Sequence, residues 1–63
     1  MDGYLARNIR KQLGLNQKEL AKMANVSRKE IDTFEKNEPL KLLDRQKILA
    51  RLFAEKTRKS CYN

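Results

Sequence analysis

The chain has 63 residues, which is the size of one small domain, and such a domain buries only about 60% of the surface that its unfolded chain exposes. Fifteen Lys and Arg residues against eight Asp and Glu residues give a formal net charge of +7, which favours a polyanionic partner such as nucleic acid. The absence of histidine and the single cysteine exclude a disulfide-stapled secreted scaffold and a Cys-based metal site, so a cytoplasmic location is expected.

Apolar residues recur at helical spacing along the whole chain, which predicts an all-α domain of four helices, with a fifth left open. The first helix is predicted from Tyr4 to Leu13. Its inward stripe consists of Leu5, Ile9 and Leu13, and its outward basic residues are Arg7, Arg10 and Lys11. Gly14 follows at the position where a left-handed helix end is expected.

The second and third helices each begin with a residue that can cap a helix. Asn16 precedes Glu19 by three residues, and Ser27 precedes Glu30 by the same interval, which is the spacing of a capping box. The second helix is expected to end near Ala24, with a left-handed turn at the next residue, an asparagine. Asn37 and Pro39 are expected to stop the third helix.

The fourth helix is predicted to start at an Asp44 cap and to fray past Glu55, so that residues 56–63 form a frayed tail. Its apolar positions are Ile48, Leu49, Leu52 and Phe53. The preceding Leu40, Leu42 and Leu43 fit either a helical turn or an extended segment that closes the core.

Only Asn25 and Val26 join the second helix to the third, and so short a connection is typical of a helix-turn-helix, here over residues 16–37 of a single domain, 1–63. Ala21 falls where two such helices approach most closely and only a small side chain fits. The apolar positions between the helices are Leu20, Ala24, Val26, Ile31 and Phe34.

The chain resembles the phage-repressor and Cro-like helix-turn-helix family, of the lambda repressor-like or Xre type. The matching residues are Ile9-Arg10, Gly14-Leu15-Asn16-Gln17, Glu19-Leu20-Ala21, Val26-Ser27, Ile31 and Glu35. The chain departs from the family at Asn25 and Asn37, where glycine is usual, and in a longer stretch from Glu38 to Leu43. The resemblance implies a small helical bundle of the lambda repressor type.

The resemblance also implies a set of DNA-binding residues: Asn16, Gln17, Ser27, Arg28, Lys29, Asp32, Thr33, Lys36 and Asn37. Within that set, Gln17 is similar to a glutamine that binds phosphate and braces the third helix. Arg28, Lys29 and Thr33 occupy positions that read base edges. Arg and Lys can donate hydrogen bonds to guanine in the major groove, and Thr can present a hydroxyl or a methyl group to a base edge. Ser27, Lys36 and Asn37 fall where phosphates are held.

Three acidic residues on the third helix oppose phosphate unless they are engaged elsewhere. Glu30 is expected to be engaged in the capping box with Ser27. Glu35 is expected to pair internally with Arg10, as this family often shows. Asp32 has two open interpretations, in which it either accepts from cytosine N4 or lies outside the groove.

The sequence therefore predicts a sequence-specific regulator that binds double-stranded DNA as a homodimer and acts as a repressor. An antitoxin-like or adaptor module on the same fold, with DNA binding secondary, is the alternative, and the acids of the third helix favour it slightly. An enzyme is not expected, because there is no histidine and no phosphate-binding glycine loop. No cofactor, metal or small-molecule ligand is expected. No membrane association is expected either, since no apolar run approaches roughly 20 residues.

Overall fold

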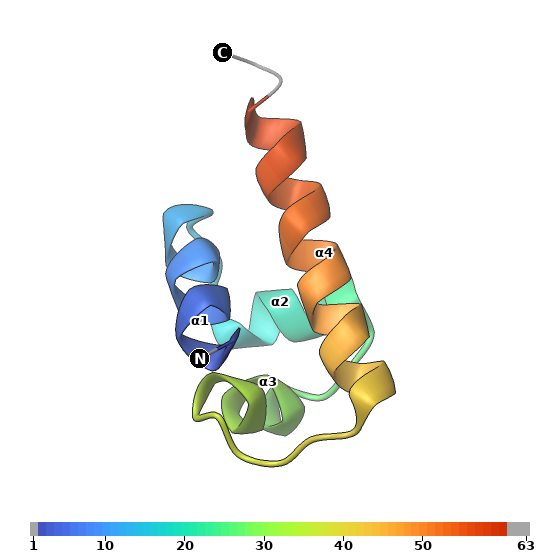
Figure 1. Ribbon diagram of the computed structural model, residues 1–63. Coiled ribbons are helices and arrows are strands. Elements are labelled where there is room, and N and C mark those ends of the chain that lie inside the picture. The colour runs from blue at the N-terminus through green and yellow to red at the C-terminus, as the bar shows by residue number, and fades with distance from the viewer. Residues whose placement is uncertain (1, 61–63) are drawn as a thin grey trace.

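The computed structural model describes residues 2–60 of the chain, with side chains from residue 3 to residue 58. Within this range there are four helices and no strands: α1 (Asp2–Gln12), α2 (Gln17–Ala24), α3 (Arg28–Glu35) and α4 (Leu42–Ser60). Figure 1 shows α2 between α1 and α4, with α3 lying across the base of the bundle. This arrangement confirms the predicted all-α class and the helix-turn-helix bundle.

One apolar core joins the four helices. Its buried members are Ala6, Ile9, Leu20, Ala21, Ala24, Ile31, Phe34, Ile48 and Leu52, and Leu13, Val26, Leu40 and Leu49 pack around them. Leu20, Ile31, Ile48 and Leu52 are the largest side chains that are fully enclosed. Since these four come from α2, α3 and α4, the core fixes the third helix against both of its neighbours.

The prediction for α1 was wrong in two respects. Leu5 is 47% exposed, and Ala6 takes the buried position in its place. Arg10 does not face outward but is only 8% exposed, because its guanidinium is drawn into contacts with α3 that are described below. Both errors arise because the helix is rotated so that Ala6, Ile9 and Arg10 face the bundle.

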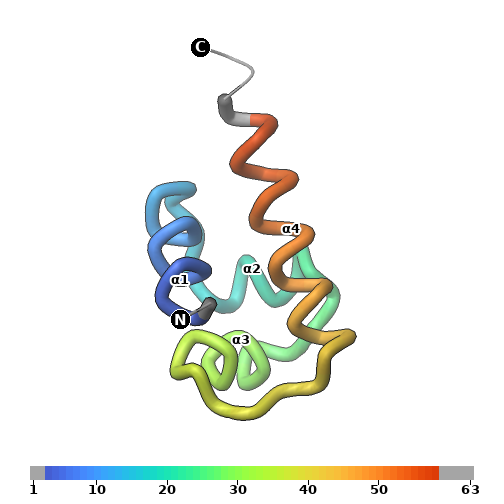
Figure 2. Tube along the Cα trace, viewed as in Figure 1, coloured from blue at the N-terminus to red at the C-terminus, as the bar shows by residue number. Residues whose placement is uncertain are grey.

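Three helices end with the same left-handed device. Gly14, Asn25 and Asn37 have φ angles of 74°, 59° and 60°, and each of the following residues donates its N–H to a carbonyl five residues back. This is the Schellman arrangement, which satisfies carbonyls that the helix leaves unpaired. The left-handed ends predicted at Gly14 and Asn25 are confirmed, and Asn37 stops α3 in the same way; Figure 2 shows how sharply the chain turns between α2 and α3.

The helix α4 is longer than predicted at both ends. It starts at Leu42, so Asp44 lies in its first turn instead of capping it, and Lys41 supplies the carbonyl that accepts from Arg45 N at 3.0 Å. At the other end, the helix continues through Ser60 instead of fraying past Glu55. Glu55 forms ion pairs with Arg51 and Arg58, and these pairs favour the helical spacing. The rest of the predicted frayed tail, residues 61–63, lies outside the described residues.

The leucines before the predicted fourth helix were expected to form either a helical turn or an extended segment that closes the core, and the structure shows both. Leu42 and Leu43 form the first turn of α4 and are 66% and 62% exposed. Leu40 lies in the non-helical connector and packs against the core. Ile48 and Leu52 are buried, whereas Phe53 is 44% exposed.

A bulkier side chain at Ala21 should destabilise the fold. Ala21 is 5% exposed within the core, so Ala21→Val adds two methyl groups where no space exists. We expect a loss of about 1–3 kcal/mol in the free energy of unfolding, and a thermal midpoint lower by roughly 5–20 °C. Ala50→Val, at an exposed position of α4, controls for the poorer helix propensity of valine. Equal midpoints for the two variants would contradict tight packing at Ala21.

Candidate nucleic-acid interface

The outward face of α3 is set by its buried side chains. Ile31 and Phe34 point into the core, so the opposite face of the helix carries Arg28, Lys29, Asp32, Thr33 and Lys36. Arg28, Lys29 and Lys36 are exposed, and Thr33 and Asp32 are partly exposed. Of the nine residues proposed from the sequence, five therefore share one helix face.

The helices α2 and α3 both begin with complete capping boxes. Asn16 Oδ1 accepts from Glu19 N at 2.7 Å, and Ser27 Oγ accepts from Glu30 N at 3.1 Å. Each glutamate in turn accepts from the backbone N–H of its cap. The Asn16 amide nitrogen and the Ser27 hydroxyl hydrogen are not needed for these caps, so both can donate to phosphate while the helices stay capped.

Arg10 and Glu35 form the buried ion pair that the family resemblance implied. Arg10 Nε and Nη2 donate to the two Glu35 carboxylate oxygens at 2.7 and 3.0 Å, and the two side chains are 10% and 5% exposed. Arg10 Nη1 also donates to the Leu15 carbonyl at 2.9 Å. One guanidinium therefore ties α1, the α1–α2 loop and α3 together behind the outward face of α3.

Gln17 connects the start of α2 to the side of α3. Its Nε2 lies 3.3 Å from Asp32 Oδ1 and 3.3 Å from Glu35 Oε1. The bracing role implied by the resemblance is therefore present in the structure. Its role in binding phosphate remains a prediction.

Asp32 is the one acid among the five residues of the outward face. Besides Gln17, it contacts Lys36, whose Nζ lies 3.1 Å from Asp32 Oδ2. The hydrogen bond with Lys36, and then the one with Gln17, lowers the pKa of Asp32, and the same contact raises the pKa of Lys36. Asp32 is thus ionised at neutral pH and holds two of the residues assigned to phosphate.

Asn37 has a structural contact that the sequence did not reveal. Its Oδ1 accepts from Gly3 N at 3.0 Å, so the end of α3 holds the start of α1. A Cβ at Gly3 would lie 2.3 Å from the Phe34 carbonyl oxygen, which explains why glycine is required there. No local signal could have found a contact between residues 34 positions apart.

A polar hollow of about 310 Å³ lies where α1, α2 and α3 meet. Its lining residues are Arg7, Arg10, Gln17, Asp32, Glu35 and Lys36. Arg7 is exposed and was not among the predicted site residues, although its place one turn before Arg10 brings it to the same hollow. The hollow adds Arg7 to the candidate interface.

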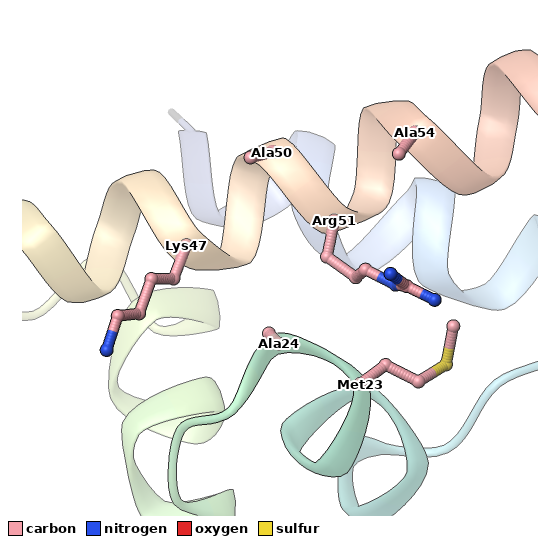
Figure 3. Close-up of a pocket in the computed structure, with 6 residues that line it drawn as sticks. All are labelled: Met23, Ala24, Lys47, Ala50, Arg51 and Ala54. Atoms are coloured by element: carbon pink, nitrogen blue, oxygen red, sulfur yellow. The ribbon is translucent and has the colours of Figure 1, made fainter.

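A second hollow, of about 260 Å³, lies between α2 and α4 and shares no residue with the first. Figure 3 shows its lining residues: Met23, Ala24, Lys47, Ala50, Arg51 and Ala54. It is shallow, mostly apolar and edged by two cations of α4. None of the predicted site residues takes part in it.

The remaining acid of α3, Glu30, faces α4. A hydrogen bond with Asp44 is the largest cause that lowers the pKa of Glu30, and it raises the pKa of Asp44 above its ordinary value of 3.8. The positive charges of Lys41 and Lys47 partly offset the rise at Asp44. When Asp44 is protonated, its carboxyl group is therefore the donor to the Glu30 carboxylate.

This carboxyl pair predicts a pH-dependent effect of Asp44→Asn. Because the pKa of Asp44 is raised, its stabilisation is present below its ordinary pKa and is lost as the pH rises through the raised pKa. The asparagine amide donates at every pH, so the thermal midpoint of the variant minus that of the wild type should grow between about pH 3 and pH 7. The lowered pKa of Glu30 acts in both proteins and largely cancels. A difference that stays constant with pH would contradict the shared hydrogen bond.

Comparison with known proteins gives one match. A family model described as helix-turn-helix, the Cro/C1-type family, matches residues 7–59, which includes α2, α3 and the turn between them. No curated protein and no solved structure gave a significant match to the chain. Among residues 2–60, no group of three or more potential metal ligands occurs. None of the described helices combines the length and the apolar character that crossing a bilayer requires.

Proposed function

The chain belongs to the Cro/C1-type helix-turn-helix family of DNA-binding transcription regulators, and from this premise we propose that it is a sequence-specific repressor that reads the major groove with α3. The observation that carries the proposal is the outward face of α3. Arg28 and Lys29 stand exposed at its start, and the internal contacts of Glu30 and Glu35 turn these acids away from that face. Arg and Lys side chains at such positions can donate to guanine O6 and N7.

The contacts to DNA divide into two groups. Arg28, Lys29 and Thr33 read base edges, whereas Asn16, Gln17, Ser27 and Lys36 hold phosphates on either side. Asn37 belongs to the second group as well, and its side-chain oxygen also accepts from Gly3 N. Because this chemistry needs neither cofactor nor metal, the protein acts by occupying its site.

Selection of bound duplexes from a random pool, carried out at two salt concentrations, tests the proposal directly. A sequence-specific regulator enriches a common motif, and the enrichment persists at the higher salt concentration because base contacts depend less on counterion release than phosphate contacts do. A pool that stays random at both concentrations contradicts sequence-specific binding.

Lys36→Ala should weaken binding without altering the choice of sequence. A phosphate contact carries no base identity, so the loss should be about equal on the selected duplex and on unrelated duplexes. The slope of log K against log salt should fall by roughly one. Titrations over a range of salt concentrations measure both quantities, and Lys56→Ala, on an exposed part of α4, serves as the control. A loss confined to one sequence, with an unchanged slope, would rule out the phosphate role.

The alternative of a protein-interaction module loses its main support. It rested on the three acids of α3, and each of these is engaged within the protein: Glu30 with its cap and Asp44, Glu35 with Arg10, and Asp32 with Gln17 and Lys36. No acid is therefore left on this helix as an obvious contact for a basic partner protein.

The regulator acts as a symmetric homodimer through α4. Leu42, Leu49 and Phe53 lie seven and four residues apart, so they fall along one line of the helix, where two of them are substantially exposed. The last turns of α4 also extend beyond the other helices (Figure 1). Exposed apolar surface of this kind often marks a contact between subunits, and two half-sites give the selectivity that one short helix lacks.

Sedimentation at tens of micromolar protein tests the homodimer. Phe53→Asp should yield a folded monomer, because Phe53 is 44% exposed and is not required by the core. Ala54→Asp places the same charge on the same helix, off the line of apolar residues, and should remain dimeric. A strictly monomeric wild type without DNA would disprove a free dimer.

A further inference from the structure

The position of Asp32 is unusual for an acid on a face that meets DNA. Its carboxylate lies between a cation one turn before it and a cation one turn after it, Arg28 and Lys36, and both charges favour its ionised form. Its two oxygens are held by two different elements, with Gln17 on α2 at 3.3 Å and Lys36 at the end of α3 at 3.1 Å. The side chains of Asp32 and Lys36 remain 43% and 61% exposed, so solvent and ligands reach both.

A DNA phosphate needs the same donors that Asp32 already uses. Phosphate oxygens and carboxylate oxygens are both anionic acceptors, and both are bound by lysine ammonium and glutamine amide groups. Gln17, Lys36 and Asp32 line one hollow together with Arg7, which makes it the place where a phosphate would approach. A phosphate that enters this hollow therefore meets donors that are occupied and a carboxylate that repels it.

On the basis of the proposed function, we propose that Asp32 limits the affinity of the protein for every duplex, because its carboxylate competes with DNA phosphates for Gln17 and Lys36. In the free protein the Asp32 carboxylate accepts from Gln17 and pairs with Lys36 at the place that a phosphate would take. Every duplex must therefore displace this carboxylate before Gln17 and Lys36 bind the DNA backbone. The displacement weakens binding to any duplex by a similar factor. Only sequences that also engage Arg28, Lys29 and Thr33 then retain useful affinity, which restrains a chain of net charge +7 from binding DNA everywhere.

The first test removes the charge and measures binding to a random-sequence duplex of about 20 base pairs, the length of two half-sites. Asp32→Asn should lower Kd by roughly two- to fivefold, since an exposed ion pair no longer has to be broken. Asp32→Ala should do the same, which excludes an effect of a new amide donor. Glu55→Gln makes the same change in net charge on the last turns of α4 and should leave Kd nearly unchanged. Tighter binding by all three variants would assign the effect to net charge and would overturn the proposal.

The second test is a double-mutant cycle, which separates competition from simple repulsion. If Asp32 occupies Lys36, then Lys36→Ala weakens binding only moderately in the wild-type background, because the lost phosphate contact is partly offset by the ion pair with Asp32 that no longer has to be broken. The same change should cost at least about twofold more in the Asp32→Ala background. Repulsion through space predicts additive effects, so an additive cycle would overturn the proposal.

A third measurement follows the free protein and does not depend on DNA affinity. The side-chain amide resonance of Gln17 in a ¹⁵N spectrum should shift on Asp32→Asn, and it should shift again when duplex is added to the wild type. A Gln17 resonance that Asp32→Asn leaves in place would overturn the proposal. A wild type that binds no duplex would overturn the proposed function as well, whereas duplex binding with an additive cycle would overturn only the role of Asp32.

Discussion

Replacing Glu35 with leucine should destabilise the protein by roughly 2–5 kcal/mol, because removal of one partner leaves the other charge of a buried pair without compensation. Glu35 is 5% exposed at its side chain, and both of its oxygens accept from Arg10. A chain of this length has a total stability of roughly 3–9 kcal/mol, so this loss removes a large fraction of the free energy of unfolding. Urea titration followed by circular dichroism measures the loss.

The double variant Arg10→Met/Glu35→Leu provides the matched control. It replaces both charges with apolar side chains of similar volume, so no buried charge remains unpaired, and its stability should return close to that of the wild type. If the double variant is as unstable as the single one, the loss arises from packing and not from the unpaired guanidinium. Both variants also remove the hydrogen bond that the Gln17 side-chain amide donates to Glu35.

Arg28→Ala should cost about 1–3 kcal/mol of binding free energy on the selected duplex and relax the preference at one or two base pairs. Arg28 is the first residue of α3 and is exposed, and its guanidinium can donate to two acceptors of one guanine. Binding should be measured against the selected duplex and against single-base variants of it, so that the affected base pairs are identified.

Arg58→Ala is the control for Arg28→Ala. It removes the same charge from an exposed position on the last turns of α4, which Figure 1 shows on the opposite side of the bundle from α3. The Arg58→Ala variant should bind the selected duplex with nearly the wild-type affinity and with the wild-type sequence preference. If Arg28→Ala kept the affinity and the preference of the wild type, α3 would have to present another face to the groove.

The local features of the fold were predictable because they depend on residues close in sequence. The capping boxes at Asn16 and Ser27 and the left-handed ends at Gly14 and Asn25 are all encoded within a few positions. The outward face of α3 could be predicted for the same reason, since Ile31 and Phe34 fix its rotation. The pair of Arg10 and Glu35 came from the family resemblance and not from spacing.

The features that were missed depend on tertiary packing. The rotation that exposes Leu5 and buries Arg10 follows from the partner of Arg10 on α3, which periodicity within α1 cannot reveal. The start of α4 was misplaced because Asp44 is a good cap in isolation, whereas here it shares a hydrogen bond with Glu30 of α3. The contact of Asn37 with Gly3 and the engagement of Asp32 by Gln17 likewise join different helices.

The triple contact of Arg10 has a consequence for how the protein opens. Because one guanidinium joins α1, the carbonyl of Leu15 and α3, these segments cannot separate one at a time without stranding a buried charge. Their amide hydrogens should therefore exchange with solvent together, in a single cooperative opening, whereas the projecting turns of α4 should exchange earlier through local unfolding. The helix α3 thus belongs to the slowest-exchanging unit, and molecules in which the end of α4 has unwound still present its outward face intact.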